Sequence, residues 1–356
     1  MNAPVFHQLE VADVEPLTDD AVAVTLDVPD DLRELFDFVP GQHVTMRAEI
    51  DGADVRRSYS ISVPPGGGRI RVGVKRVPSG AFSTYATTRL SPGDVLDVMP
   101  PVGEFTLTPE PGSRKHYVAI VAGSGITPVM SMVSSALSAD PTARFTLVYG
   151  NRTSQSVMFL EELEGLKDRY RARFHLINVL SREPQPVDLF TGRIDHEKLE
   201  TMLSRLIDPE DVDDWFLCGP YGLIETAREV LAGHGVDPAT VHDELFFAGD
   251  TPPIPLVDES DAQEGSVMVG FTLDGRRSTV GMEPDQTILE AALRVRGGLP
   301  FSCKGGVCAT CKARLVAGEV TMDKNYALVG EEVAAGYILT CQSHPTTDTV
   351  EVDYDV

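Results

Sequence analysis

Short apolar runs separated by turn residues fill the first 110 residues of the chain. Residues 21–26, 69–74 and 95–98 are rich in β-branched and other strand-forming side chains, and Gly/Pro clusters lie between them at 39–41, 64–68 and 91–94. Regularly spaced short strands with such punctuation are typical of a small β-barrel. We therefore predict a barrel over residues 1–110, with a weak boundary at 108–114.

The pattern changes after residue 111. Continuous apolar runs at 117–122, 145–149, 174–180 and 215–218 alternate with amphipathic stretches at 128–137, 158–170, 196–207 and 224–231. Strands without polar alternation are buried on both faces, which is the usual condition of a parallel sheet covered by helices. An α/β unit over 111–247 is the prediction.

A segment rich in Pro, Gly and acidic residues follows at 248–265 and shows no apolar periodicity, so we predict a linker there. The remaining residues, 266–356, contain a strand-like run at 267–273, a helical stretch at 288–295 and then a cysteine-rich loop. A unit of fewer than 100 residues with clustered thiols fits a fold that is organised by a metal centre.

Length and charge narrow the function classes. The chain has 356 residues, which suggests two or three domains, and its net charge is −24. Nucleic acid and anionic membrane surfaces would repel such a chain. We find no apolar run long enough for a transmembrane helix and no signal-peptide pattern at the start, so we expect a cytoplasmic protein.

Four of the five cysteines lie in the last 54 residues, in the pattern C-x4-C-x2-C followed by 29 residues and a fourth cysteine. This is the plant-type [2Fe–2S] spacing, and two sulfide-bridged irons need four thiolate ligands. Gly305 and Gly306 let the loop curl and leave N–H groups free for the sulfurs. A structural zinc site is the alternative, although it usually has two C-x2-C knuckles. The predicted ligands are Cys303, Cys308, Cys311 and Cys341.

A candidate flavin motif lies at 56–62, in the β-rich piece. An arginine can hold a pyrophosphate, an aromatic ring can pack on an isoalloxazine and a hydroxyl can bond to a ring nitrogen. Taken alone, the motif also fits an edge strand with a surface arginine. Downstream, a basic strand end and a Gly-Ser turn open a helix, whose free N–H groups suit phosphate. Together they favour a flavin nucleotide held by Arg57, Ser58, Tyr59, Ser60, Val74, Lys75, Gly80, Phe82 and Ser83.

A candidate nicotinamide motif follows the first buried strand of the α/β unit. It reads G-x-G-x-x-P, and its proline suits the first turn of a helix. Its residues are Gly123, Ser124, Gly125, Ile126, Thr127 and Pro128. After the next strand comes Arg152 and no acid, which favours NADPH over NADH, although it could be only a surface arginine. Cys218, Gly219 and Pro220 end another buried strand, where ligands gather, but Cys218 equally fits as a small buried apolar residue.

The motifs follow one another along the chain as R-S-Y-S, G-S-G-I-T-P, C-G-P and the cysteine loop. With these motifs in this order, the chain resembles, over its whole length, the ferredoxin–NADP reductase-like oxygenase reductases with a C-terminal ferredoxin domain. The resemblance implies an FAD-binding Greek-key β-barrel, a Rossmann-like NAD(P)-binding parallel sheet and a β-grasp [2Fe–2S] domain. It also implies electron transfer from NADPH, with NADH as an alternative, to FAD, to the cluster and then to an oxygenase. Stretches at 149–152, 192–199, 303–312 and 334–342 look most like reductase subunits of phenylacetyl-CoA epoxidases, which serve a di-iron oxygenase.

The resemblance assigns further roles. Ser60 would lie near the flavin N5, Cys218 against the nicotinamide, and Glu244 and Phe246 beside the flavin, although Glu244 could be only a solvated acid. The linker would let the ferredoxin domain visit the flavin and then the partner. Reductases of Rieske oxygenases such as 3-ketosteroid 9α-hydroxylase share this architecture and are the alternative. A redox-sensing iron–sulfur flavoprotein is a second alternative, from a different functional class.

Overall fold

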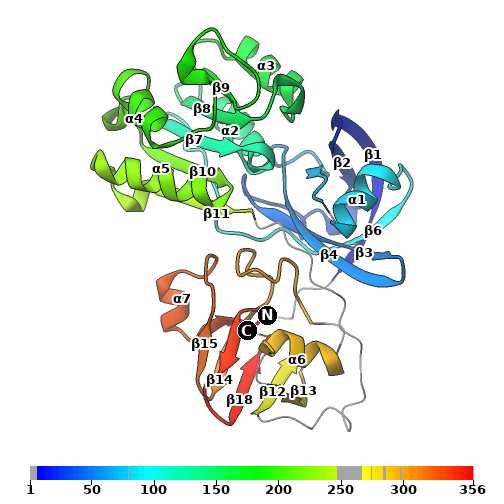
Figure 1. The fold of residues 1–356 in the computed structure, drawn as a ribbon. Helices are drawn as coiled ribbons and strands as arrows, with labels where there is room; N and C mark the ends of the chain where they lie inside the picture. Colours follow the sequence, from blue (N-terminus) through cyan, green and yellow to red (C-terminus); the bar gives the residue numbers. More distant parts are fainter. Residues whose placement is uncertain are drawn as a thin grey trace.

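The computed structural model describes residues 6–78, 80–246, 267–273, 275–283, 286–296 and 299–355. The predicted linker at 248–265 lies outside the described residues. None of the described helices is both long and apolar enough to span a membrane. The described residues form three units, each with its own sheet (Figure 1).

The first unit is an antiparallel barrel, as predicted. Its six strands lie in the order β4-β3-β6-β1-β2-β5, and a bridge between Ile61 and Val72 brings the two ends of the sheet together. Inward-facing side chains such as Leu9, Val24 and Met46 are fully buried in its core. The elements are β1 (His7–Thr18), β2 (Ala21–Asp27), β3 (His43–Ile50), β4 (Ala53–Ser60), β5 (Arg69–Lys75), α1 (Ala81–Thr88) and β6 (Val95–Val98).

The second unit is a five-stranded parallel sheet in the order β11-β10-β7-β8-β9. Val118 and Ile120 of β7 face one apolar cluster, and Ala119 and Val121 face another, so the strand is apolar throughout because both faces are buried. The elements are β7 (His116–Ala122), α2 (Ile126–Ala139), β8 (Arg144–Asn151), α3 (Leu160–Arg169), β9 (Phe174–Leu180), α4 (His196–Arg205), β10 (Asp214–Gly219), α5 (Tyr221–Gly233) and β11 (Val241–Leu245).

The chain order of this sheet reverses between β7 and β10. From β7 the chain runs outward through β8 and β9, and it then returns to the other side of β7 as β10 and β11. Ligands of such sheets bind beyond the carboxyl ends of the strands at this switch point. The glycine loop after β7 and the Gly219-Pro220 turn after β10 both lie there.

The third unit is a mixed sheet, β13-β12-β18-β14-β16, with a separate β15-β17 pair. Helix α6 packs on it and begins with a capping box between Thr287 and Glu290. The elements are β12 (Val267–Leu273), β13 (Arg276–Met282), α6 (Ile288–Val295), β14 (Lys312–Ala317), β15 (Val320–Met322), α7 (Gly330–Ala334), β16 (Tyr337–Leu339), β17 (Ser343–Pro345) and β18 (Thr349–Asp353). Figure 1 shows this unit, yellow to red, below the other two.

Candidate functional site

All three units line one cavity of about 1270 Å³. Ordinary ligand pockets measure about 300–1,000 Å³, so the cavity can hold more than one ligand of ordinary size. Many residues singled out from the sequence line it: Arg57, Ser58, Tyr59, Ser60, Lys75, Gly80, Phe82, Ser83, Gly123, Ser124, Thr127, Arg152, Gly219, Pro220, Glu244, Phe246, Cys303 and Cys308. Seven other predicted site residues are not among the lining residues: Val74, Gly125, Ile126, Pro128, Cys218, Cys311 and Cys341.

On the barrel side, the cavity meets an aromatic pair and the start of a helix. The rings of Tyr59 and Phe82 are 5.5 Å apart, and the fully buried Phe82 packs against Tyr59. The Ser83 hydroxyl accepts from the Val77 N–H at 3.1 Å and donates to the Gly80 carbonyl at 3.2 Å. These bonds hold the turn before α1, so that the helix begins beside the cavity, and the N-terminal end of a helix is a favourable place for an anion.

A chain of polar contacts links the barrel to the end of β11. The Ser60 hydroxyl donates to Glu244 at 3.4 Å, and the second Glu244 oxygen is 3.7 Å from Nδ1 of His43. Burial alone would lower the pKa of His43, but Glu244 and the neighbouring Cys308 raise it above the ordinary value. The other ring nitrogen of His43 is buried without a hydrogen-bond partner among the described residues. Sequence reasoning missed His43, which carries no motif signal.

On the α/β side, two backbone segments touch. A Cβ on Gly125 would lie 2.3 Å from the Cys218 carbonyl oxygen, so the glycine loop and the Cys218-Gly219-Pro220 turn approach as closely as a glycine allows. The Tyr149 hydroxyl donates to the Gly123 carbonyl at 2.9 Å and supports the same loop. Cys218 is fully buried, which raises the pKa of its thiol well above the ordinary value.

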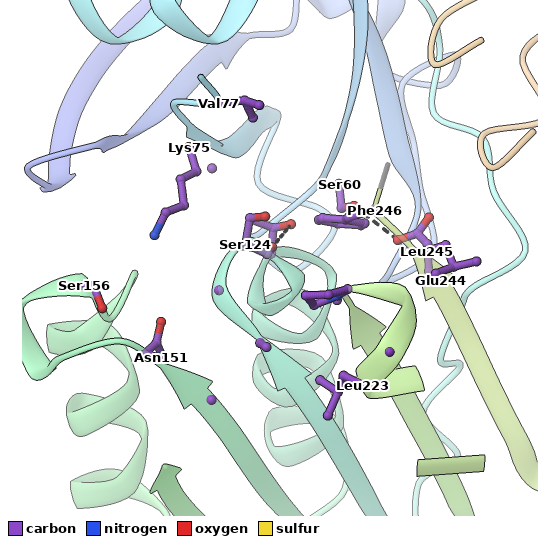
Figure 2. Close-up of a pocket in the computed structure, with 18 of the residues that line it drawn as sticks. Ser60, Lys75, Val77, Ser124, Asn151, Ser156, Leu223, Glu244, Leu245 and Phe246 are labelled. Atoms are coloured by element: carbon purple, nitrogen blue, oxygen red, sulfur yellow. Dashed lines mark hydrogen bonds between the residues drawn. The ribbon is translucent and has the colours of Figure 1, made fainter. Parts of the chain in front are cut away.

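The far end of the cavity carries polar groups at the end of β8 (Figure 2). Asn151 and Ser156 line it beside Arg152, and Nδ2 of Asn151 is buried with no hydrogen-bond partner among the described residues. Arg193 lines it too, from the stretch before α4. A buried amide without a partner beside two arginines suits an anionic, hydrogen-bonding ligand such as a nucleotide. Neither Asn151 nor Arg193 was singled out as a site residue from the sequence.

The four clustered thiols form two pairs. The neighbouring Cys308 thiol lowers the pKa of Cys303 to about 7, and Cys303 in turn raises the pKa of Cys308. Cys341 and Cys311 form a second pair of the same kind, with the pKa of Cys341 lowered and that of Cys311 raised. Among the described residues, no three potential ligands converge as they would around a single ion. Two pairs of soft donors fit a two-iron cluster, in which each iron takes two thiolates.

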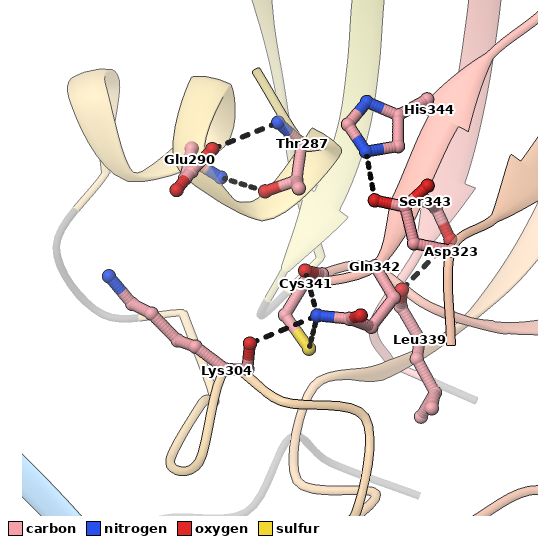
Figure 3. A network of polar contacts seen from close by, with 9 residues as sticks. All are labelled: Thr287, Glu290, Lys304, Asp323, Leu339, Cys341, Gln342, Ser343 and His344. Atoms are coloured by element: carbon pink, nitrogen blue, oxygen red, sulfur yellow. Dashed lines mark hydrogen bonds and ion pairs between the residues drawn. The ribbon is translucent and has the colours of Figure 1, made fainter. Parts of the chain in front are cut away.

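Backbone and amide groups surround these sulfurs. The Gly305 N–H donates to Cys303 Sγ at 3.3 Å, and the Cys303 N–H donates to Cys308 Sγ at 3.5 Å. Gly306 has φ 79°, and a Cβ there would lie 2.9 Å from the Lys324 carbonyl oxygen, so the loop needs glycine at this point. Figure 3 shows Gln342 donating to the carbonyls of Lys304 and Cys341, at 3.0 and 2.8 Å, which ties the loop to the fourth cysteine.

Comparison with known proteins assigns each unit. The chain matches the models for an oxidoreductase FAD-binding domain over residues 8–107, an oxidoreductase NAD-binding domain over 119–229 and a 2Fe-2S iron-sulfur cluster binding domain over 271–346. It is 44% identical to one of the subunits of 1,2-phenylacetyl-CoA epoxidase from Escherichia coli K12, with 98% of each chain covered. The chain belongs to the ferredoxin–NADP reductase-like oxygenase reductases with a [2Fe–2S] domain.

Two further comparisons support the same family assignment. The reductase is 32% identical to the ferredoxin reductase component of 3-ketosteroid-9-alpha-monooxygenase from Rhodococcus rhodochrous, over 97% of this chain and 96% of the relative. The crystal structure of phthalate dioxygenase reductase has the same fold, with a TM-score of 0.59, 23% identity and 98% of each chain covered. This reductase therefore carries electrons from a pyridine nucleotide through FAD and a [2Fe–2S] cluster to an oxygenase component.

Proposed function

We propose that this chain is the NADPH-dependent reductase of a phenylacetyl-CoA epoxidase, and that its partner is a di-iron oxygenase. The observation that carries the proposal is the 44% identity to the Escherichia coli phenylacetyl-CoA epoxidase chain, which extends over 98% of both chains. The identity to the steroid-type reductase is 32% over a similar length. A cytoplasmic location accords with a pyridine nucleotide donor and with five cysteines that form no disulfide.

We also propose the division into residues 1–110 for FAD, 111–247 for NAD(P), 248–265 as linker and 266–356 for the cluster. The three family models match inside these bounds. When bound, the two dinucleotides and the cluster supply the redox chemistry, a hydride transfer followed by one-electron transfers. The chain's own residues bind and orient these groups and keep water away.

For FAD, Arg57 and the start of α1 would hold the pyrophosphate, and the Tyr59 ring would pack on the isoalloxazine. The Ser60 hydroxyl donates to Glu244 at 3.4 Å, and its oxygen would accept a hydrogen bond from the flavin N5. Phe246, the last described residue before the linker, lines the cavity beside Glu244 and Leu245 (Figure 2) and would cover the ring. Each of these groups orients FAD, and none is needed as a nucleophile.

For the nicotinamide nucleotide, the first turn of α2 and the glycine loop would bind the phosphates, with Thr127 at the cavity wall. Arg152 would pair with a 2′-phosphate, which is the reason for choosing NADPH. Cys218 would act through its backbone and its packing behind the wall, since its side chain is fully buried. Cys303 with Cys308, and Cys311 with Cys341, would each hold one iron.

The test is oxygen-dependent NADPH consumption with purified phenylacetyl-CoA epoxidase oxygenase subunits, with and without phenylacetyl-CoA. We expect consumption that depends on the substrate and yields the ring epoxide. An oxygenase that stays idle, while the protein reduces a dye from NADPH, would refute the partner. The same assay with a steroid-type Rieske oxygenase would then identify the alternative, and an absence of bound flavin would favour a redox sensor.

A further inference from the structure

The strand that carries the candidate flavin residues also contacts the cysteine unit. Arg56 of β4 donates through Nη1 to the Leu299 carbonyl at 2.6 Å. Ser58, two residues further on, bonds to the Ser302 hydroxyl at 2.9 Å. Ser302 directly precedes Cys303, so both contacts hold the chain just before the first cluster cysteine.

Strand β4 contacts both the cavity and the cysteine unit. Arg57, Ser58, Tyr59 and Ser60 line the cavity, whereas Arg56 does not. Arg56 instead lies against the cysteine unit, with its guanidinium 4.5 Å from the centre of the Phe301 ring. The strand therefore contacts the cysteine unit through Arg56 and Ser58, and Ser58 also lines the cavity.

The Arg56 guanidinium is buried and hydrogen-bonds to both the barrel and the cysteine unit. Its side chain is 1% exposed, and its fork makes two bonds to the Asp54 carboxylate, at 2.9 and 2.7 Å. Leu299, which accepts the third bond, is fully buried in the core of the cysteine unit. A buried guanidinium is costly unless all its donors find partners, and a planar fork on fixed partners defines one geometry.

We propose that Arg56 is a positioning residue for electron transfer between the two cofactor sites, an inference that rests on the proposed function. Arg56 fixes segment 299–302 so that Cys303 and Cys308 face the cavity. Of the four cluster cysteines, only these two are lining residues. Cys303 and Cys308 therefore lie on the side of the cluster that faces the FAD site. In the transfer step the flavin loses one electron and the cluster gains it.

A purely structural role in the barrel is the competing explanation, because Asp54 belongs to the same strand. Arg47 provides a control for the loss of an arginine–aspartate pair within the barrel. It lies directly opposite Arg56 in the β3–β4 register, and its guanidinium bonds to Asp97 at 2.9 Å and lies 4.1 Å from the Phe6 ring. Its partner Asp97 is in the barrel sheet, so Arg47→Gln removes a more exposed ion pair that lies within the barrel.

The experiment compares full-length Arg56→Gln, Arg56→Lys and Arg47→Gln, each loaded with flavin and iron. Stopped-flow absorbance follows flavin reduction by NADPH and then cluster reduction, and hydrogen exchange with mass spectrometry follows the peptide at 299–303. Loss of a charge-assisted bond weakens docking about tenfold. We expect Arg56→Gln to slow cluster reduction about tenfold and to speed exchange at 299–303, with flavin reduction unchanged. Arg56→Lys should be intermediate, and Arg47→Gln should match the wild type.

Wild-type cluster reduction and exchange in Arg56→Gln would overturn the proposal, as would an equal effect of Arg47→Gln or loss of flavin from Arg56→Gln. If Arg56→Gln does not fold, Ser302→Ala tests the same contact surface without touching the Asp54 pair. It should slow cluster reduction about threefold because one neutral hydrogen bond is lost. Failure of the proposed function is distinguishable, because the wild-type cluster would then still be reduced by NADPH while the epoxidase oxygenase stayed idle.

Discussion

Gly125 lies where two backbone segments meet, and one added methyl group there should push them apart. A Cβ would be 2.3 Å from the Cys218 carbonyl oxygen and 2.6 Å from its carbonyl carbon. Neither atom is the end of a flexible side chain, so a whole loop must move. Gly123 differs, because it has φ 56° and open space around it. The two glycines of this motif are therefore required for different reasons: Gly123 because its backbone is left-handed, and Gly125 because another backbone segment lies against it.

The size of the effect follows from this geometry. Ordinary contact begins at 3.4 Å, so Gly125→Ala requires a displacement of about 1 Å. Overpacking of this kind costs about 1–3 kcal/mol, and we expect the upper end because backbone must move. The melting temperature of the α/β unit should fall by about 4–10 °C. A shift of about 1 Å at the dinucleotide loops should slow flavin reduction by NADPH about 100-fold.

Thermal unfolding measures the expected loss of stability, and stopped-flow absorbance measures the expected slowing of flavin reduction. Gly165→Ala is the matched control, since it lies within α3 with no atom within 4 Å of its Cβ position and should stabilise the protein by about 0.5–1 kcal/mol. Dithionite should reduce the flavin of Gly125→Ala at the wild-type rate, because it bypasses the nucleotide. A Gly125→Ala protein with wild-type melting and wild-type flavin reduction by NADPH would refute the reasoning.

Three further predictions concern other sites. Cys311→Ser should lose iron and the visible cluster absorption while NADPH still reduces the flavin; retention of two irons per chain would contradict the ligand set. Arg152→Ser should raise KM for NADPH about tenfold and leave that for NADH unchanged, and equal effects on both would reduce Arg152 to a surface residue. The Thr142 hydroxyl donates a hydrogen bond to Asp140, which is the main cause of a pKa lowered from 3.8 to about 2, and the Thr142 N–H donates a second. The pKa of Asp140 is lower in the folded than in the unfolded chain, so the free energy of unfolding of the wild type should exceed that of Asp140→Asn at pH 7. This advantage should disappear as the pH falls from about 4 to about 2. Urea unfolding at several pH values measures it, and a difference that does not change with pH would disprove the prediction.

Elements with strong local signals were predictable. The helix predicted at 288–295 is α6, because its capping box and its apolar face are both local. The strands of the parallel sheet were visible as continuous apolar runs, because both faces are covered. By contrast, β1 and β3 were not singled out. Acids and other polar residues interrupt them, and only pairing with β2, β4 and β6 makes them strands.

The site divides in the same way. The spacing of three of the four cluster cysteines lies within one loop, so short-range geometry alone indicated the chemistry. The R-S-Y-S and G-x-G motifs are also local, and most of their residues line the cavity. The neighbours of these motifs were not predictable. Ser60 meets Glu244 from 184 residues away, and His43 joins them without belonging to any motif.

The sequence by itself determined which cofactors the chain can hold, because each binding motif is a short run whose spacing sets its own geometry. Only the tertiary structure decided how the three binding regions face one another. Arg56 and Leu299 are 243 residues apart, and their contact depends on how a barrel and a separate sheet pack together. No local pattern encodes that arrangement, since it results from the combined burial of surfaces contributed by distant parts of the chain.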